Sequence, residues 1–523
     1  MNKVPRRDLA GWLLFSGLHL LNALFHCQWA DELQAWSLVR ESRNLSELQW
    51  LLSDDGHPAL WYVLLWPLRF LTANPGAQQV VSSVCAIAVL ALLWTRSPFR
   101  FHEKVLLSLS FQLGYALSVV SRSYVLGTLL IFLFAALWPR YQDRPWVGWV
   151  LLALLCNVHI LYAPLSFCLA LLWIDSRDER TDCLSGLSYY LLGVFWCSSV
   201  VLFDWGGLLR VKTYWFLALP TLAIAALLIL ALRSKLGPRG VLLLAWMALP
   251  PMSMMFNRFW GSTRARPEQA FSNFGVGLTP VVNPLQPDYW HLGIPQGLGL
   301  FLASVSCLVI VLYFRRRPFL LALIGLHAAF LLIVSSYLIP GRLWHAGVFF
   351  TGLLGVIWLA RRQQASLGPD WLLLVLFIPQ ALVGSNAMIR SKTIPISSCY
   401  ATAKWIRQQN LPAERLVGFS IFPTLGVATY LEEPIYFPEM NRRTASFDWT
   451  SGVNPPVGAK LIARRMRLLK LSPTYLVAPA GSEELLKFLD ESGITTREIF
   501  RSPPALRGRY EVWELQLSDT SPP

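Results

Sequence analysis

Residues 9–36 read LAGWLLFSGLHLLNALFHCQWADELQAW, an apolar run that leads directly into two carboxylates. The apolar part, which extends to Phe25, is long enough to cross a bilayer and follows a basic segment at residues 1–8. No small-residue cleavage site comes after it, so we predict a retained first membrane span rather than a removed signal peptide. The carboxylates of Asp31 and Glu32 then lie at the far end of this span.

The rest of the chain repeats the pattern of apolar runs and short polar loops. Of its 523 residues, 54% are hydrophobic and 14% are charged, whereas soluble proteins carry about 25% charged residues. We therefore predict an α-helical polytopic membrane protein with thirteen spans. They are expected near residues 9–27, 78–95, 105–120, 123–138, 146–158, 160–174, 187–203, 214–232, 241–256, 297–314, 319–338, 345–360 and 371–387.

The positions of Lys and Arg predict the orientation. With the spans above, most basic loops fall on the side of the N-terminus, and the positive-inside rule makes that side cytoplasmic. This rule also accounts for the net charge of +15, so no nucleic-acid partner is predicted. Thirteen crossings then place the C-terminus outside, in the periplasm of a bacterial inner-membrane protein.

The outer side carries three large segments. We predict a transmembrane module at residues 1–389, with outer loops at 28–77 and 257–295, and a small α/β domain at 390–523. In the first loop, residues 59–71 are too short to span and are expected to form an interfacial helix anchored by Trp61, Tyr62 and Trp66. In the C-terminal domain the pattern predicts helices at 398–409, 424–431, 458–469 and 483–491, and strands at 416–420, 475–477, 497–500 and 510–515.

Cations in the short outer turns are candidates for anion binding, because such turns normally avoid arginine. Arg122, His159, Arg342 and His345 lie in these turns, and Arg264 lies in the second large outer loop. Each side chain has a structural alternative, an ion pair or a snorkelling position. Snorkelling is the expected role of Arg210 and Lys212.

Several reaction classes have no motif in this sequence. It contains no P-loop, no dinucleotide-binding glycine fingerprint after a strand and no Asp-x-Asp pair, which disfavours nucleotide-driven chemistry. The eight cysteines show no paired spacing, so neither a disulfide framework nor a zinc site is predicted. The spans carry no chain of acids typical of a proton pump.

Three motifs in their order along the chain resemble the GT-C fold of integral-membrane glycosyltransferases. They are the acidic pair Asp31-Glu32 after the first span, His57-Pro58 before the interfacial helix, and Arg122 in the turn after the third span. The nearest likeness is to the lipid A aminoarabinose transferase and protein O-mannosyltransferase branch. His57 departs from that branch, where relatives often have Lys or another basic residue.

The resemblance implies a monosaccharide donor linked to polyprenyl phosphate and a glycolipid, glycan or protein acceptor, with membrane lipids around the spans. Asp31 would take the acceptor proton, and Glu32 would position the acceptor or a metal. The donor phosphate would be held by Arg122, Arg342, His57, His345 and Arg264. Asp55, Tyr124 and His159 would contact the acceptor or support these residues. No cofactor is required, and a divalent cation at Asp31 and Glu32 stays open.

Two alternative functions remain open from the sequence. A transporter or lipid flippase would also be polytopic, but its usual signature is a pair of broken helices in two related halves, and we find one break, at residues 157–159. A non-catalytic assembly protein would bind a partner through the C-terminal domain. Within that domain Glu439, Asp448 and Trp449 are candidates for acceptor contact, with a plain loop as the structural alternative.

Overall fold

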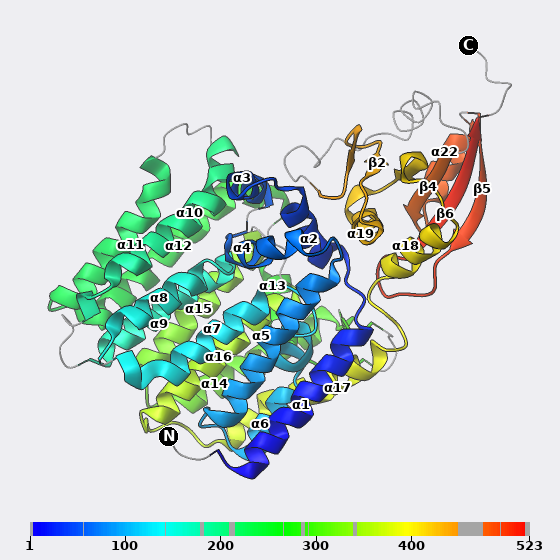
Figure 1. Cartoon of the computed structure of the whole chain (residues 1–523). Helices are drawn as coiled ribbons and strands as arrows, with labels where there is room; N and C mark the ends of the chain where they lie inside the picture. Colours follow the sequence, from blue (N-terminus) through cyan, green and yellow to red (C-terminus); the bar gives the residue numbers. More distant parts are fainter. Residues whose placement is uncertain are drawn as a thin grey trace. The chain divides into compact units, whose positions relative to one another are not determined.

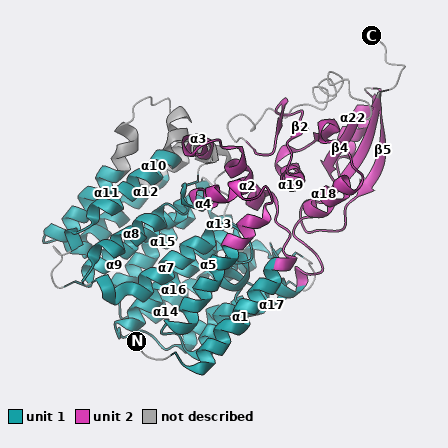
Figure 2. Ribbon diagram, in the orientation of Figure 1, with its two compact units in different colours: residues 1–23, 56–61, 82–389 teal, residues 24–55, 62–81, 390–523 magenta. Residues whose placement is uncertain are grey.

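The computed structural model describes residues 4–55, 57–141, 143–177, 183–208, 215–264, 266–283, 288–290, 292–337, 342–447, 474–491 and 493–517 (Figure 1). Contacts divide the chain into two compact units, coloured in Figure 2. Unit 1 comprises Met1–Ala23, Gly56–Trp61 and Ser82–Ile389, and unit 2 comprises Leu24–Asp55, Tyr62–Val81 and Arg390–Pro523.

Unit 1 is helical. Its helices, some of which extend a few residues beyond the unit, are α1 (Arg6–Phe25), α5 (Gly76–Thr95), α6 (Phe101–Ser108), α7 (Tyr124–Leu137), α8 (Pro145–Cys156), α9 (Ala163–Asp175), α10 (Leu187–Leu208), α11 (Trp215–Arg233), α12 (Gly237–Arg264), α13 (Pro267–Leu278), α14 (Gln296–Phe314), α15 (Pro318–Tyr337), α16 (Leu343–Arg362) and α17 (Trp371–Arg390). Within the described residues, seven helices are long and apolar enough to cross a membrane. The chain is thus a multi-pass membrane protein, and the count of thirteen spans stays a prediction.

Helix α16 is the central helix of unit 1. All residues from Leu343 to Ala360 are buried, and α16 packs against α7, α13 and α15. A helix that is apolar on every side is typical of such an enclosed position. Because its neighbours surround it, the N-terminal end of α16 is held rigidly, and that end carries two of the predicted phosphate-binding residues.

The third predicted span is not a single regular helix. Helix α6 ends at Ser108, and a π-helical turn, η2 (Phe111–Ala116), follows it. Gln112 stabilises this irregular backbone by donating to the carbonyls of Gly277 and Leu343, at 3.0 and 2.8 Å. Irregular backbone at membrane depth is tolerated where protein surrounds it, and residues 110–121 are all buried. The turn leads the chain directly to Arg122.

A second break lies where the sequence predicts it, at residues 157–159. Helix α8 ends at Cys156, and a short 3₁₀ turn, η4 (Ile160–Tyr162), leads into α9. The side chain of Asn157 donates to the carbonyls of Ala153 and Gly193, at 2.8 and 2.7 Å, and its own carbonyl accepts from the N–H of Leu60 at 3.0 Å. These bonds satisfy the interrupted backbone and fix the position of His159.

A buried ionic network fastens the other end of α16. Arg361 forms a two-pronged ion pair with Glu103 of α6, at 2.6 and 2.7 Å, and a further pair with Asp370 at 2.8 Å. Asp370 also pairs with Arg100 at 2.6 Å. Glu103 is fully buried, and buried charges are tolerated when they are paired in this way. The network therefore ties the C-terminal end of α16 to α6.

Unit 2 contains a small α/β layer. Its strands are β1 (Leu416–Gly418), β2 (Ile435–Phe437), β3 (Arg442–Thr444), β4 (Thr474–Pro479), β5 (Ile494–Arg501) and β6 (Tyr510–Leu517), in the order β3-β2-β1-β4-β6-β5. β1 pairs in parallel with β2 and β4, and the other pairs are antiparallel. The helices are α2 (Ala30–Glu41), α3 (Leu45–Asp55), α18 (Cys399–Gln408), α19 (Ile421–Leu431) and α22 (Glu483–Glu491). The small α/β domain predicted from the sequence is confirmed.

The strand pair β2–β3 was not predicted from the sequence, because each strand is only three residues long. The four predicted strands and the helices at 398–409, 424–431 and 483–491 are present with shifted ends. The helix predicted at 458–469 lies outside the described residues.

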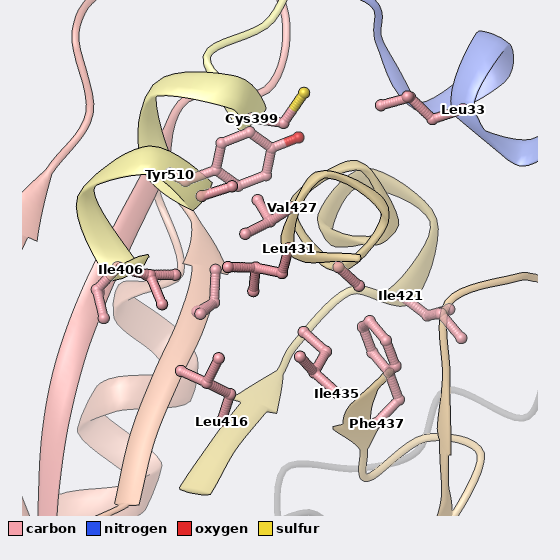
Figure 3. Close-up of a cluster of buried hydrophobic side chains, with 14 of the residues drawn as sticks. Leu33, Cys399, Ile406, Leu416, Ile421, Val427, Leu431, Ile435, Phe437 and Tyr510 are labelled. Carbon is pink, nitrogen blue, oxygen red and sulfur yellow. The ribbon is translucent and has the colours of Figure 1, made fainter. Parts of the chain in front are cut away.

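The first outer segment folds together with the C-terminal residues in unit 2. Gln34 of α2 donates to the carbonyl of Phe447 at 2.7 Å and accepts from its N–H at 2.9 Å. Ser37 bonds Thr429 of α19 at 2.8 Å, and Leu33 joins the buried cluster shown in Figure 3. The segment that carries Asp31 and Glu32 is therefore packed against a folded domain, while the predicted domain boundary at 389/390 stays a prediction.

The segment predicted as an interfacial helix at residues 59–71 is helical, as α4 (Leu60–Leu65) and the 3₁₀ helix η1 (Trp66–Phe70), and its interfacial position stays a prediction. Trp61 and Tyr62 are buried, so the prediction that these two side chains anchor the segment at the headgroups is wrong. Their large apolar rings contribute to the protein core instead. The exposed apolar residues of the segment are Leu64, Phe70 and Leu71.

Candidate functional site

The two neighbouring acids of α2 have different surroundings. Glu32 is fully buried, and both of its carboxylate oxygens lie 2.9 Å from Nε2 of His26. Its Oε2 also accepts the backbone N–H of Trp29 at 3.2 Å, which satisfies one of the free N–H groups at the helix start. Glu32 thus holds the segment from His26 to α2 in place, and its predicted contact with acceptor or metal stays a prediction.

The pairing with Glu32 favours the charged form of His26. Burial by itself lowers the pKa of His26, but the charge and hydrogen bond of Glu32 outweigh it and raise the pKa above the usual range. The side chains are 2% and 0% exposed. An ion pair so isolated from water is costly to break, because either partner alone would be a buried charge.

Asp31 is placed differently from Glu32. It is half-buried at the second position of α2, where the positive end of the helix dipole favours a carboxylate. Because successive helical residues point about 100° apart, Asp31 and Glu32 face different directions. The geometry therefore buries the Glu32 carboxylate against His26 and leaves Asp31 nearer the surface.

Unit 1 gathers the predicted phosphate-binding residues at the starts of several helices. Arg122 precedes α7, His159 precedes η4 and α9, and Arg342 and His345 begin α16. α16 packs against both α7 and η4. The imidazole rings of His57 and His159 lie 4.8 Å apart. The fold thus brings together five residues from four distant parts of the sequence.

His159 and Tyr124 form the buried centre of this group. Nδ1 of His159 accepts the N–H of Leu161 at 3.2 Å, which places the proton of the neutral ring on Nε2. Nε2 lies 3.3 Å from the Tyr124 hydroxyl and donates to it. Burial, followed by the charges of His57, His345 and Arg122, keeps the pKa of His159 well below its usual value. His159 is consequently a neutral donor that positions Tyr124.

The cations in this group oppose the helix dipoles. Helix N-termini attract anions and repel cations, yet Arg122 and Arg342 both lie at such ends. The guanidinium of Arg122 is 5.5 Å from the Tyr124 ring centre. The guanidinium groups of Arg122 and Arg342 are both close enough to His345 to interact with it electrostatically. Positive side chains added to positive helix ends are a favourable surrounding for a phosphate.

Most of the remaining predicted site residues lie outside the part of the chain that the structure describes. The side chains of Asp55 and Arg264 lie outside the described residues, as do Arg210, Lys212, Asp448 and Trp449. Glu439 accepts the N–H of Ser420 at 2.6 Å, a contact that orders the turn before α19. Among the described residues, no group of three or more His, Cys, Asp or Glu side chains is arranged to hold a metal ion.

The chain was compared with known protein families, curated proteins and solved structures. Neither a protein-family model nor a curated protein matches this sequence. Among solved structures, the crystal structure of ArnT from Cupriavidus metallidurans bound to undecaprenyl phosphate is similar. The likeness covers 98% of this chain and 99% of that chain, with 11% identity and a TM-score of 0.39. At that TM-score the roles of residues in this chain rest on its own geometry.

Sequence analysis missed His26 because it lies just after an apolar run, where a lone histidine gives no signal. Only the turn between α1 and α2 brings it back to Glu32, six residues later. It also missed Cys27 and Cys399, which lie close to the same backbone carbonyl, that of Gln28. Their separation along the chain hides this proximity.

The His26–Glu32 pair predicts a pH dependence of stability. The pKa of His26 is raised in the folded state, so the stabilisation is complete below the unfolded value of about 6.5 and is lost as the pH rises through the folded value. We expect the wild-type melting temperature to fall over this alkaline window by more than that of a His26→Phe variant, whose ring cannot titrate. Equal pH profiles of the two proteins, measured by thermal unfolding in detergent, would contradict the pairing.

Proposed function

We propose that this protein transfers a monosaccharide from a polyprenyl-phosphate donor to an acceptor at the outer face of the bacterial inner membrane, by a single inverting displacement. The observation that carries the proposal is the group of Arg122, His159, Arg342 and His345 at the starts of α7, η4 and α16. Guanidinium groups gathered at the positive ends of helices are a favourable surrounding for the phosphate of such a donor.

The donor bond supplies the energy of the reaction. A polyprenyl phosphate is a good leaving group, so the enzyme needs to stabilise the negative charge that grows on its oxygen as the sugar bond breaks. Arg122 and Arg342 are suited to this because a guanidinium forms two parallel hydrogen bonds to phosphate. Tyr124, which accepts from His159 and lies beside Arg122, belongs to the same group.

The acceptor hydroxyl or amine must lose a proton as it attacks. We assign this step to Asp31, because its carboxylate is nearer the surface than that of Glu32. Glu32, bound to His26, is a positioning residue that holds the start of α2. A divalent cation at Asp31 stays a proposal to be tested by chelation.

Donor recognition is tested with Arg122→Ala. The loss of one charge-assisted interaction, worth about 1.5–3 kcal/mol, should weaken binding of undecaprenyl phosphate by roughly tenfold to a hundredfold. Arg315→Ala is the matched control, because Arg315 is an exposed arginine of unit 1 in the turn between α14 and α15. Titration of purified protein with the lipid would show whether only the first variant loses affinity.

Equal affinities in the two variants would remove Arg122 from phosphate recognition. The proposal as a whole is tested by product analysis with a panel of undecaprenyl-phosphate monosaccharides. Release of undecaprenyl phosphate together with a glycosylated acceptor is expected. Movement of the labelled lipid across proteoliposomes with no covalent product would instead favour a flippase.

A further inference from the structure

Two cysteines meet in unit 2 beside the His26–Glu32 pair. Cys27 follows α1, and Cys399 begins α18. The Cys399 thiol donates to the carbonyl of Gln28 at 3.1 Å, and Sγ of Cys27 lies 3.8 Å from the same oxygen. Two thiols that share one acceptor atom are close neighbours, and both are reduced in this structure.

The surroundings of the two thiols are unequal. Cys27 is half-buried, whereas Cys399 is fully buried in the cluster shown in Figure 3, which also contains Leu33 and Tyr510. The hydrogen bond with Cys399 and the charge of His26 lower the pKa of Cys27. Burial, then the interaction with Cys27, raises the pKa of Cys399. A more exposed, more acidic thiol next to a buried one is the arrangement of an attacking and a resolving cysteine.

We propose that Cys27 and Cys399 form a reversible disulfide that locks the start of α2 onto the C-terminal domain of unit 2. The inference rests on the proposed function in one respect, the placement of this unit on the oxidising outer side of the membrane. Cys27 is adjacent to His26, so the bond would fix the segment that carries Asp31 and Glu32.

The oxidant is an external disulfide, either an oxidised thiol–disulfide oxidoreductase or glutathione disulfide. The Cys27 thiolate attacks one of its sulfurs, a mixed disulfide forms, and the first thiolate leaves. Cys399 then loses its proton and attacks Sγ of Cys27, which forms the Cys27–Cys399 bond and releases the second thiolate. Two protein thiols are oxidised and one external disulfide is reduced to two thiols, so the step balances.

A Cys27–Cys399 bond requires the two sulfurs to approach each other from their contacts with the Gln28 carbonyl. A disulfide needs the sulfurs at about 2.05 Å and the Cα atoms within about 7 Å. Cys399 packs against Gly426 of α19, where an added Cβ would lie 3.2 Å from its sulfur. A side chain at position 426 would therefore crowd the Cys399 sulfur, and glycine avoids this.

The test uses the purified full-length protein in detergent, equilibrated with mixtures of reduced and oxidised glutathione. After free thiols are alkylated, non-reducing digestion and mass spectrometry should find one peptide pair joining Cys27 to Cys399. Oxidation should also raise the melting temperature by about 4 °C or more. Cys27→Ser should lose both effects, and the matched control Cys85→Ser, which changes a buried cysteine of α5, should keep them.

Alkylation of both cysteines at the most oxidising ratio would overturn the proposal, as would linkage of either one to a different cysteine. Neither readout requires a sugar donor, so a failure here is distinct from a failure of the proposed transferase activity. If a variant folds poorly, detection of the Cys27–Cys399 peptide pair in the wild-type protein is sufficient to test the proposal.

Discussion

Asp31→Asn should reduce glycosyl transfer by about a hundredfold to ten-thousandfold, the usual contribution of a general base. The amide is nearly the same size as the carboxylate but cannot accept the acceptor proton. Because Asp31 is half-buried and lies beside, not within, the His26–Glu32 pair, the melting temperature should stay near that of wild type. Initial rates with a defined donor, measured together with thermal unfolding, separate the two properties.

Glu47→Gln is the matched control for this variant, because it changes an acid of α3 in the same segment. It should retain wild-type transfer. Asp31→Asn with near wild-type rates in the same assay would remove Asp31 as the base. An unchanged rate with an added chelator would further indicate that the carboxylate acts without a metal.

Glu32→Leu should destabilise unit 2 by roughly 3–5 kcal/mol, the cost of removing one partner of a buried ion pair. His26 would remain in a site that is 2% exposed with no carboxylate to neutralise it, and the N–H of Trp29 would lose its acceptor. We expect a large drop in melting temperature and early proteolysis of the segment around α2. Any loss of transfer would follow the loss of folded protein.

A double variant tests the reason for this effect. His26→Leu with Glu32→Leu removes both polar partners at once, and such replacements of a buried pair are often neutral or stabilising. The double variant should therefore be more stable than Glu32→Leu alone. Additive destabilisation by the two substitutions would show that they do not act through one pair.

Individual residues show how far the sequence could predict this protein. Hydropathy predicted the multi-pass helical character of the chain and the break at His159, since both depend on local runs of apolar residues. It did not predict the irregular turn after Ser108, because that turn is stabilised by Gln112 bonds to Gly277 and Leu343. It treated Asp31 and Glu32 as a pair, although His26 gives Glu32 a buried partner.

The sequence by itself determined that the chain is a multi-pass membrane protein with a small α/β domain, because hydrophobic length and period are local properties of the chain. Only the tertiary structure decided which polar residues meet. It brought His57, Arg122, His159 and His345 together in unit 1, and Cys27 and Cys399 together in unit 2. Such contacts depend on the packing of segments that are far apart in the sequence. No local sequence pattern predicts them.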